Sequence, residues 1–293
     1  MKKINFTKMV ATGNDFIVMD FRPFRLRQGF GGQASIVHHP SWQKLVTSIC
    51  QRRVGIGADG VLVLEKSKKA DFKMRIFNID GSEAQMCGNG LQCATLFVGG
   101  TKRLKVETKA GFYEAEITAK ESVKVKMVEP KDLKINLPII INDRAIKVNF
   151  INTGVPHVVI FVSGIDEIDV EGIGQNVRYH KEFSPKGANV DFVEVINNKN
   201  IKMRTYERGV EGETLACGTG AVASAIVTMG DGRRTKDEGS TALTTGGRGT
   251  KRKVSVHTKG GVLKVSFSVK GSEIEDVYLE GEAREVFVGS VTV

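Results

Sequence analysis

The alternation of apolar and polar residues along this chain of 293 residues predicts a protein built mainly from β-strands. Apolar stretches that alternate with polar residues, or that are rich in β-branched residues, are typical of strands. Such stretches occur three times in each half of the chain, at residues 16–19, 61–64, 123–127, 158–162, 192–196 and 262–267.

Each half also contains one segment that predicts a buried α-helix. Residues 91–97 (LQCATLF) and 221–227 (AVASAIV) are small and apolar on all sides, as in helices enclosed by protein. Both segments directly follow a Cys-Gly-x-Gly sequence. We therefore expect a mainly antiparallel sheet or barrel wrapped around a central helix, twice.

The two halves repeat one pattern. Four anchors occur in the same order in both halves, 129–150 residues apart, which is too long a period for a solenoid. The repeat predicts an α+β fold of two tandem domains related by a pseudo-twofold axis. We expect one domain at residues 1–130, completed by a C-terminal strand at 282–293, and the other at 131–281. The paired anchors are TGNDF (12–16) with TGVPH (153–157), GAD (57–59) with GAN (187–189), MRIF (74–77) leading to CGNG (87–90) with MRTY (203–206) leading to CGTG (217–220), and VETKAG (106–111) with VHTKGG (256–261).

The net charge of +10 raises the question of nucleic-acid binding. Residues 21–33 contain three arginines and no acid, and residues 230–253 contain seven Lys or Arg and three acids. Both segments are rich in Gly and polar residues and lack apolar periodicity, so we predict inserted surface loops without core residues. Because these loops carry most of the net charge, they indicate solvated inserts rather than a surface for nucleic acid.

Several features predict a cytoplasmic location. No apolar run is long enough to span a bilayer, and no apolar segment follows the basic N-terminus as it would in a secretory signal. Four cysteines are too few for a disulfide scaffold in a chain of this length. We therefore expect free thiols and no membrane association.

The paired Cys-Gly-x-Gly motifs indicate acid and base chemistry. Cys87 and Cys217 each precede a predicted helix, whose N-terminus offers free N–H groups and the positive end of the helix dipole. This setting predicts a lowered thiol pKa and a docking place for a ligand carboxylate. If a pseudo-twofold axis brings the two termini face to face across a cleft, one thiol lies on each side of a carbon next to that carboxylate. One thiolate then removes a proton and the other thiol delivers one, which inverts the carbon.

The other cysteines and the glycine-rich segment at 55–60 have structural interpretations. Cys50 and Cys93 lie in apolar segments and are expected to be small buried hydrophobes. No CxxC spacing or suitable histidine supports zinc at Cys87, and we expect no metal or cofactor. Residues 55–60 match GxGxxG, but a strand follows where a dinucleotide site needs a helix, so we predict a turn.

Taken together, these motifs resemble the diaminopimelate epimerase family over nearly the whole chain outside the two basic segments. The resemblance implies interconversion of LL- and meso-diaminopimelate in lysine and peptidoglycan synthesis, independent of pyridoxal phosphate or metal. We further expect a homodimer that binds a small-molecule substrate and neither nucleic acid nor membrane. The segments that carry the resemblance are TGNDF (12–16), RRVGIGADG (52–60), RIFNIDGSEAQMCGNG (75–90), TGVPH (153–157), GANVDFVEV (187–195) and YERGVEGETLACGTGA (206–221).

The resemblance also implies a role for each matched residue. Cys87 and Cys217 are the proton donor and acceptor, and His157 and Glu207 lie near the reacting centre and tune the thiols. Backbone N–H groups hold the reacting carboxylate, and side chains bind the substrate, with Arg208 and the asparagines chiefly at its distal amino-acid end. The residues that contact substrate are Asn14, Asn78, Gly88, Asn89, Asn189, Glu207, Arg208, Gly218 and Thr219.

Other interpretations of these residues are open, and the chain differs from the usual family pattern at several positions. Judged alone, an asparagine is more often a turn residue, Arg208 a surface charge and His157 a core histidine. The chain has Gly60 and Val155 where many members have Gln and Asn, and CGNGLQC where CGNGARC is common. A proline-racemase-like enzyme on the same fold is one alternative, and an inactive binding protein of this fold is another. Retention of both cysteines argues against the second.

Overall fold

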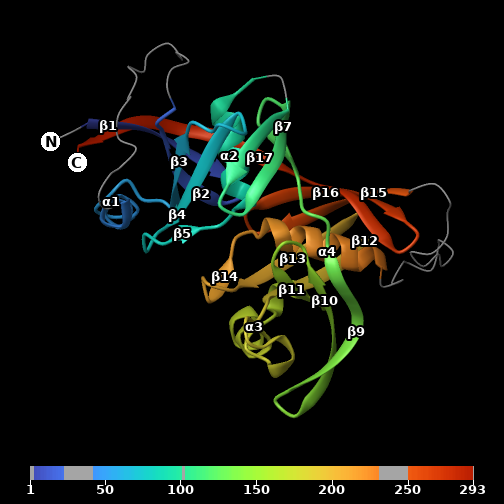
Figure 1. Ribbon diagram of the computed structural model, residues 1–293. Helices are drawn as coiled ribbons and strands as arrows, with labels where there is room; N and C mark the ends of the chain where they lie inside the picture. The colour runs from blue at the N-terminus through green and yellow to red at the C-terminus, as the bar shows by residue number, and fades with distance from the viewer. Residues whose placement is uncertain (1–2, 23–41, 101–102, 231–249, 293) are drawn as a thin grey trace. The chain divides into compact units, whose positions relative to one another are not determined.

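A computed structural model describes residues 3–22, 42–100, 103–230 and 250–292 of the chain. The chain divides into two compact units, one of Met1–Val125 with Gly281–Val293 and one of Lys126–Glu280 (Figure 1). The last strand, β17 (Glu273–Thr292), contributes residues to both units.

The first unit is a closed barrel around one helix. Its strands are β1 (Lys3–Ala11), β2 (Asn14–Asp20), β3 (Gly60–Glu65), β4 (Phe72–Asn78), β6 (Leu104–Thr108), β7 (Gly111–Ala119), β8 (Ser122–Lys126) and the C-terminal part of β17. They pair in the order given, and β17 pairs with both β8 and β1, which closes the ring. The steps β2–β3 and β4–β6 are parallel, and β5 (Glu83–Ala84) adds a short antiparallel pairing to β4.

The second unit repeats this succession of pairings. Its strands are β9 (Lys131–Ile141), β10 (Arg144–Asn152), β11 (Pro156–Phe161), β12 (Asn189–Asn197), β13 (Asn200–Glu207), β14 (Gly212–Thr214), β15 (Thr250–Thr258), β16 (Gly261–Lys270) and the start of β17. Counted from β10, the counterpart of β1, the second and fourth steps (β11–β12 and β13–β15) are again parallel, and the neighbouring pairs are antiparallel. The Met127 N–H donates to the Val277 carbonyl across 2.9 Å, which joins the chain before β9 to β17.

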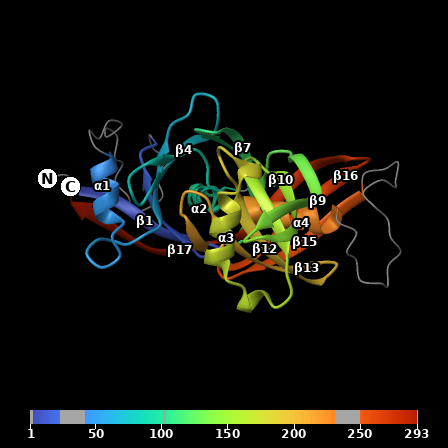
Figure 2. The same cartoon turned by 90° about the horizontal axis from the view of Figure 1, so that it is seen from below.

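A buried helix occupies the middle of each unit. Helix α2 (Gly88–Val98) contacts β1, β2, β3, β4 and β7, and α4 (Gly218–Gly230) contacts β10, β11, β12, β13, β15 and β16 (Figures 1 and 2). Nine consecutive residues of α4, from Gly220 to Thr228, are buried. These helices confirm the predicted architecture of a mainly antiparallel sheet around a central helix in each of two similar domains.

The chain ends meet on the first unit. Strand β1 pairs antiparallel with β17 from Lys3 opposite Thr292 to Ala11 opposite Ala283, with a register shift after Lys8. Figures 1 and 2 both show the two termini side by side. The C-terminal residues of the chain therefore complete the barrel that its N-terminal residues begin.

The structure contains two α-helices that the sequence interpretation did not predict. In α1 (Trp42–Ile49) three residues, Leu45, Val46 and Ile49, are buried along one side. Helix α3 (Val170–Arg178) begins after Asp169, whose carboxylate accepts from the Gly172 N–H at 2.9 Å. Both helices are one-sided and short, so they pack on the outside of the strands and do not resemble the fully enclosed central helices.

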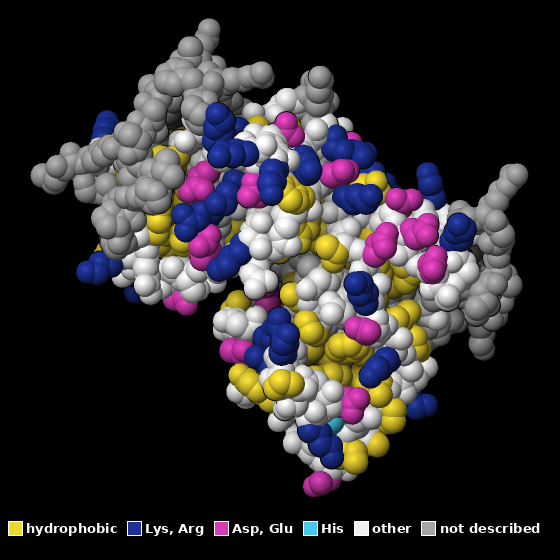
Figure 3. Space-filling view, in the orientation of Figure 1, with side chains coloured by type: hydrophobic (Ala, Val, Ile, Leu, Met, Phe, Trp, Pro, Cys, Tyr) yellow, Lys and Arg dark blue, Asp and Glu magenta, His cyan; other side chains and the backbone are white. Residues whose placement is uncertain are grey.

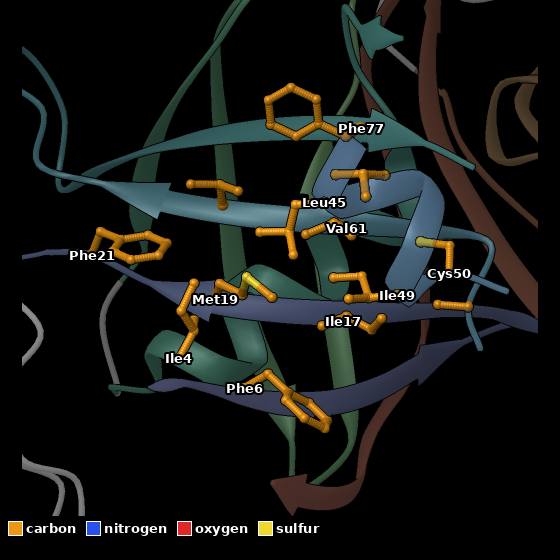
Figure 4. Packing of buried hydrophobic residues seen from close by; sticks show 13 residues of the cluster. Ile4, Phe6, Ile17, Met19, Phe21, Leu45, Ile49, Cys50, Val61 and Phe77 are labelled. Atoms are coloured by element: carbon orange, nitrogen blue, oxygen red, sulfur yellow. The ribbon is translucent and has the colours of Figure 1, made fainter. Parts of the chain in front are cut away.

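The expectation that residues 21–33 carry no core residue is wrong at Phe21. Its side chain is 6% exposed and packs edge-on against Trp42, with ring centroids 5.7 Å apart. Figure 4 shows Phe21 in one cluster with Ile4, Met19 and Leu45, contributed by β1, β2 and α1. Residues 23–33 of this predicted insert lie outside the described residues.

The predicted insert at residues 230–253 is also too long at both ends. Gly230 is the last residue of α4, and Thr250–Lys253 begin β15, where Arg252 pairs with Phe267 of β16. The intervening residues 231–249 lie outside the described part of the chain. The predicted turn at residues 55–60 is an irregular segment up to Asp59, and a strand, β3, begins at Gly60 as expected.

Charged side chains of both signs mix on the face shown in Figure 3. Lys and Arg side chains among the described residues lie next to Asp and Glu side chains there, instead of forming one continuous basic area. Ion pairs among the described residues include Arg75 with Glu83 at 2.8 Å and Arg103 with Glu114 at 3.3 Å.

Candidate active site

Cys87 occupies the N-cap position of α2. Its backbone is extended, and its Sγ accepts a hydrogen bond from the Gly90 N–H at 3.5 Å. This is the arrangement in which an N-cap side chain satisfies one of the free N–H groups of the first helical turn. The half-buried sulfur therefore lies at the positive end of the helix dipole, as the sequence predicted for this half.

A directional chain of hydrogen bonds runs beside Cys87. The Asp59 carboxylate can only accept, so Asn14 donates through Nδ2 to Asp59 Oδ2 at 3.2 Å. Asn14 Oδ1 then accepts from Asn89 Nδ2 at 2.6 Å. This leaves the buried Asn89 Oδ1 with no hydrogen-bond donor among the described residues. Two of the predicted substrate residues, Asn14 and Asn89, are thus in contact, and they present a free acceptor.

Ion pairs fix Asp59, which lies at the other end of this series of hydrogen bonds. Asp15 lies 2.7 Å from Lys8 Nζ and 2.8 Å from Arg52, and Arg52 also pairs with Asp59. Burial opposes ionisation of Asp15, but hydrogen bonds from Arg52 and Lys8 outweigh it and lower the pKa of Asp15 to about 2. These charges fix the loop that carries Asp59, and through Asp59 the orientation of the Asn14 amide.

Asn78 lies apart from this chain at the end of β4. Its Nδ2 donates to the Ser82 hydroxyl at 3.0 Å, and the side chain is exposed. Opposite it on β3 is Gly60. A Cβ at Gly60 would lie 2.6 Å from the Phe77 carbonyl oxygen, so this backbone excludes any side chain there. The lack of a side chain at residue 60 therefore fits the local packing.

Cys217 directly precedes α4 and is 6% exposed. Its Sγ lies 3.4 Å from the Thr219 hydroxyl oxygen. Burial raises the pKa of the Cys217 thiol well above its usual range, and the charges of Glu207 and Asp191 raise it further. The prediction of a lowered pKa is therefore wrong for this cysteine, because desolvation and two nearby carboxylates outweigh the helix terminus.

A buried polar network lies beneath Cys217. His157 on β11 is fully buried, with Nδ1 2.7 Å from Asp191 Oδ2 and Nε2 2.9 Å from Thr219 Oγ1. Asn189 Nδ2 also reaches His157 Nε2, at 3.3 Å. Thr153 of the TGVPH segment donates to the Thr219 carbonyl at 3.0 Å and so ties that segment to the first turn of α4. Three predicted site residues, His157, Asn189 and Thr219, therefore meet around one imidazole.

Glu207 and Arg208 follow at the end of β13. Burial raises the pKa of Glu207 and the charge of Asp191 adds to this, although Thr214 donates to its Oε2 at 3.0 Å. The Arg208 N–H donates to Asn189 Oδ1 at 2.7 Å, and the Arg208 guanidinium reaches the Gly187 carbonyl at 3.3 Å. Both residues thus lie within the second unit close to the network around His157.

The remaining cysteines are structural, as predicted. Cys50 and Cys93 are fully buried, and burial raises the pKa of Cys50 to about 11 and that of Cys93 well above its usual range. Among the residues that the structure describes, no group of three or more His, Cys, Asp or Glu is placed to hold a metal ion. None of the described helices is long and apolar enough to cross a membrane.

Two buried polar residues of this site were missed by the sequence interpretation. Asp191 is fully buried in β12, and Thr205 on β13 donates to its Oδ1 at 2.8 Å. An acid between apolar residues, directly before the predicted strand at 192–196, was the available signal, because an ionised side chain is seldom fully buried without a partner.

A model of the family described as diaminopimelate epimerase matches residues 6–132 and 149–286. The match includes both cysteine motifs and the residues around them. The chain belongs to the diaminopimelate epimerase family.

Relatives in this family match along their whole length. A diaminopimelate epimerase of Methanocella arvoryzae is 40% identical over 313 aligned positions, covering 100% of this chain and 98% of the relative. Those of Chlorobaculum tepidum and Aquifex aeolicus are each 38% identical, covering 97% and 99% of this chain and 100% and 98% of the relative. The family assignment therefore applies to the full chain.

Solved structures share the fold at low sequence identity. A PhzF-family phenazine biosynthesis protein of Bacillus anthracis covers both chains completely with a TM-score of 0.69 at 16% identity. A probable proline racemase of Agrobacterium radiobacter covers 99% of this chain and 93% of its own, with a TM-score of 0.67 at 15% identity. At such identities these likenesses support the duplicated epimerase fold and carry no conclusion about the substrate.

Proposed function

We propose that this enzyme epimerises LL-2,6-diaminopimelate to meso-diaminopimelate, a step of lysine and peptidoglycan synthesis, with Cys87 and Cys217 as its acid and base. The supporting observation is the duplication itself. Each unit places one cysteine directly before the first turn of its enclosed helix, where backbone N–H groups and the helix dipole favour a ligand carboxylate. Family membership over the full chain supports the substrate.

The proposal assigns different resting states to the two thiols. Burial and the carboxylates of Glu207 and Asp191 favour the protonated form of Cys217. Cys217 is therefore the resting acid, and Cys87 is the base that takes the substrate α-proton. In the reverse direction the roles exchange, because the product leaves Cys87 protonated and Cys217 deprotonated. The mechanism requires the two sulfurs to serve opposite faces of the reacting carbon.

The remaining site residues bind the substrate in this proposal. The N–H groups of Gly88, Asn89, Gly218 and Thr219 hold the reacting carboxylate. Asn89 Oδ1 is a buried acceptor with no donor among the described residues, which suits an ammonium group of the substrate. The distal amino-acid end is bound by the remaining predicted contacts, Asn14, Asn78, Asn189 and Arg208, while His157 and Glu207 tune the thiols.

We further propose that the enzyme works in the cytoplasm as a homodimer. The proposed location rests on the expected free thiols, and the proposed homodimer rests on the resemblance to the family. Analytical ultracentrifugation of the full chain across a range of concentrations measures the assembly, and a monomer at all concentrations contradicts the dimer.

The reaction is tested by incubating the reduced enzyme with LL-diaminopimelate in deuterium oxide. We expect meso-diaminopimelate in chiral separation, with deuterium at the inverted carbon by proton NMR. A Cys50→Ala variant is the matched control, because it removes a buried thiol outside the site and should retain turnover. Proline in place of diaminopimelate tests the alternative substrate class. Inversion of proline and not of diaminopimelate would overturn the proposed substrate.

A further inference from the structure

Besides its charge near Cys217, the fully buried carboxylate of Asp191 makes two side-chain contacts within the second unit. It faces His157 Nδ1 at 2.7 Å with one oxygen and accepts from Thr205 at 2.8 Å with the other. An ionised carboxylate is costly to bury unless it is hydrogen-bonded, and here each oxygen has a partner. Its position next to the imidazole makes Asp191 the group that decides where the imidazole proton lies.

The neighbouring hydrogen bonds settle the direction of this contact. The Arg208 backbone N–H can only donate, so it fixes Asn189 Oδ1 as its acceptor at 2.7 Å. Asn189 therefore turns its Nδ2 donor to His157 Nε2, at 3.3 Å. An Nε2 that accepts from Asn189 carries no proton, so a neutral His157 holds its proton on Nδ1 and donates it to Asp191.

Thr219 connects this imidazole to the sulfur of Cys217. Its hydroxyl oxygen lies 2.9 Å from His157 Nε2 and 3.4 Å from Cys217 Sγ. When Cys217 is protonated, the thiol donates to Thr219 and the Thr219 hydroxyl donates to Nε2. When Cys217 has given up its proton, the same hydroxyl can turn and donate to the thiolate. Nε2 then keeps Asn189 as its donor, so no buried group loses all its partners in either state.

Among the described residues of the first unit, apolar side chains take the equivalent positions. The strand registers make Phe16, Leu62 and Ile76 the counterparts of His157, Asp191 and Thr205. Phe16 pairs across β2–β3 as His157 pairs across β11–β12, and Leu62 faces Ile76 as Asp191 faces Thr205. Three apolar side chains thus fill the places of the polar network, so any effect of Asp191 should fall on Cys217 alone.

We propose that Asp191 is a positioning residue that holds His157 in its Nδ1–H tautomer, so that the Thr219 hydroxyl can accept from the Cys217 thiol and donate to its thiolate. The proposal rests on the proposed acid and base role of Cys217. The titratable groups that face this pair from the described strands are Asp191 on β12 and Glu207 on β13. The variant described below removes the charge of Asp191 and leaves Glu207 unchanged.

Asp191→Asn keeps the shape of the side chain and removes its charge. The new amide can donate to Nδ1, which favours the Nε2–H tautomer and opposes the donor from Asn189. We expect kcat to fall by at least about tenfold, as when a histidine loses the carboxylate that fixes its tautomer, with KM changed by less than about threefold. Thr228→Val is the control for a general loss of buried polar contacts in the second unit. It removes a buried hydroxyl that donates to the Ser224 carbonyl at 2.7 Å. This control should retain the kcat of the parent enzyme.

Two measurements separate positioning from stability. Proton–nitrogen NMR of His157, assigned by comparison with a His157→Asn variant, should show the proton on Nδ1 in the parent and on Nε2 in Asp191→Asn. Solvent exchange of the substrate α-proton should slow when Asp191→Asn is added to Cys87→Ser, where only Cys217 is left. It should be nearly unchanged when added to Cys217→Ser, where only Cys87 is left.

Each outcome bears on a different statement. If the parent enzyme exchanges no α-proton, the proposed function fails, and the NMR measurement still tests the tautomer. An Nδ1 proton that persists in Asp191→Asn, or equal slowing in both cysteine backgrounds, would overturn the positioning role. Should Asp191→Asn fail to fold, Thr219→Val and Thr219→Ser carry the test at the half-buried helix terminus. Val should slow exchange by Cys217, and Ser should restore it.

Discussion

At the scale of single residues, the two cysteines share a backbone setting and differ in the side chains around them. In the helical turn that Cys87 caps, Asn89 donates to Asn14, whose amide is oriented by Asp59. Cys217 lies in the field of Glu207 and Asp191, which favour its protonated form. The position of each cysteine could be predicted from Cys-Gly-x-Gly. The charge around Cys217 could not, because it depends on strands that are distant in sequence.

Glu207 gives a pH dependence whose sign can be worked out. Burial raises its pKa above that in the unfolded chain, so the folded protein binds this proton more tightly. Tighter binding of this proton adds to the free energy of unfolding. The contribution is complete below the unfolded pKa of about 4.5 and is lost as pH rises through the folded pKa. We expect the free energy of unfolding to fall over that interval in the parent, and to fall less in Glu207→Gln. Urea titrations at a series of pH values measure both slopes, and identical slopes would show that Glu207 does not titrate in this way.

At the scale of elements, the enclosed helices were predictable and the two short outer helices were not. Residues 91–97 and 221–227 are apolar on every side, which fits only an enclosed helix. By contrast, α1 has just 8 residues and α3 just 9, so their one-sided patterns extend over about two turns. The parallel pairings were also beyond prediction, because no turn connects β2 to β3 or β11 to β12 and the partner is chosen by tertiary packing.

The first turns of α2 and α4 offer a matched pair of substitutions. A Cβ at Gly220 would overlap Asp191 Oδ1, which accepts from Thr205, whereas a Cβ at Gly90 would lie 3.1 Å from a methyl carbon of Leu62. Both changes to Ala gain the same helix propensity, about 1 kcal/mol. We expect Gly220→Ala to lose about 1–3 kcal/mol more stability than Gly90→Ala and most of its activity. Thermal unfolding and turnover measure the difference, and equal losses would contradict the tight contact at Asp191.

At the scale of the whole molecule, the duplication could be recognised in the sequence because its anchors recur at equivalent places, such as strands β4 and β13 and the first turns of α2 and α4. The same anchors begin β2 and β11, and they precede β3 and β12. The edges of the predicted inserts were less accurate, since an apolar residue or a short strand at the border of a Gly-rich segment gives no periodic signal. Phe21 and Thr250–Lys253 are the residues concerned.

Substitution of Phe21 tests whether this residue belongs to the core. Because its side chain is 6% exposed and packs on Trp42, we expect Phe21→Ala to lower the free energy of unfolding by about 3–5 kcal/mol. Phe112→Ala is the control, since Phe112 is 48% exposed on β7 and its loss should cost less than about 1 kcal/mol. Denaturant titration of both variants gives the comparison. A loss at Phe21 no larger than that at Phe112 would mean that Phe21 belongs to a dispensable surface segment after all.

The central claim is that two thiols serve opposite faces of one carbon, and α-proton exchange in the single variants Cys87→Ser and Cys217→Ser tests it most directly. A serine hydroxyl is a far weaker base than a thiolate, so each variant should lose most epimerisation. Each should still exchange the α-proton of diaminopimelate with deuterium oxide on the face served by its remaining thiol. We expect one variant to exchange the LL isomer faster and the other the meso isomer, with no exchange when both thiols are removed. A shared preference of both variants for the same isomer would contradict the account and require a single base.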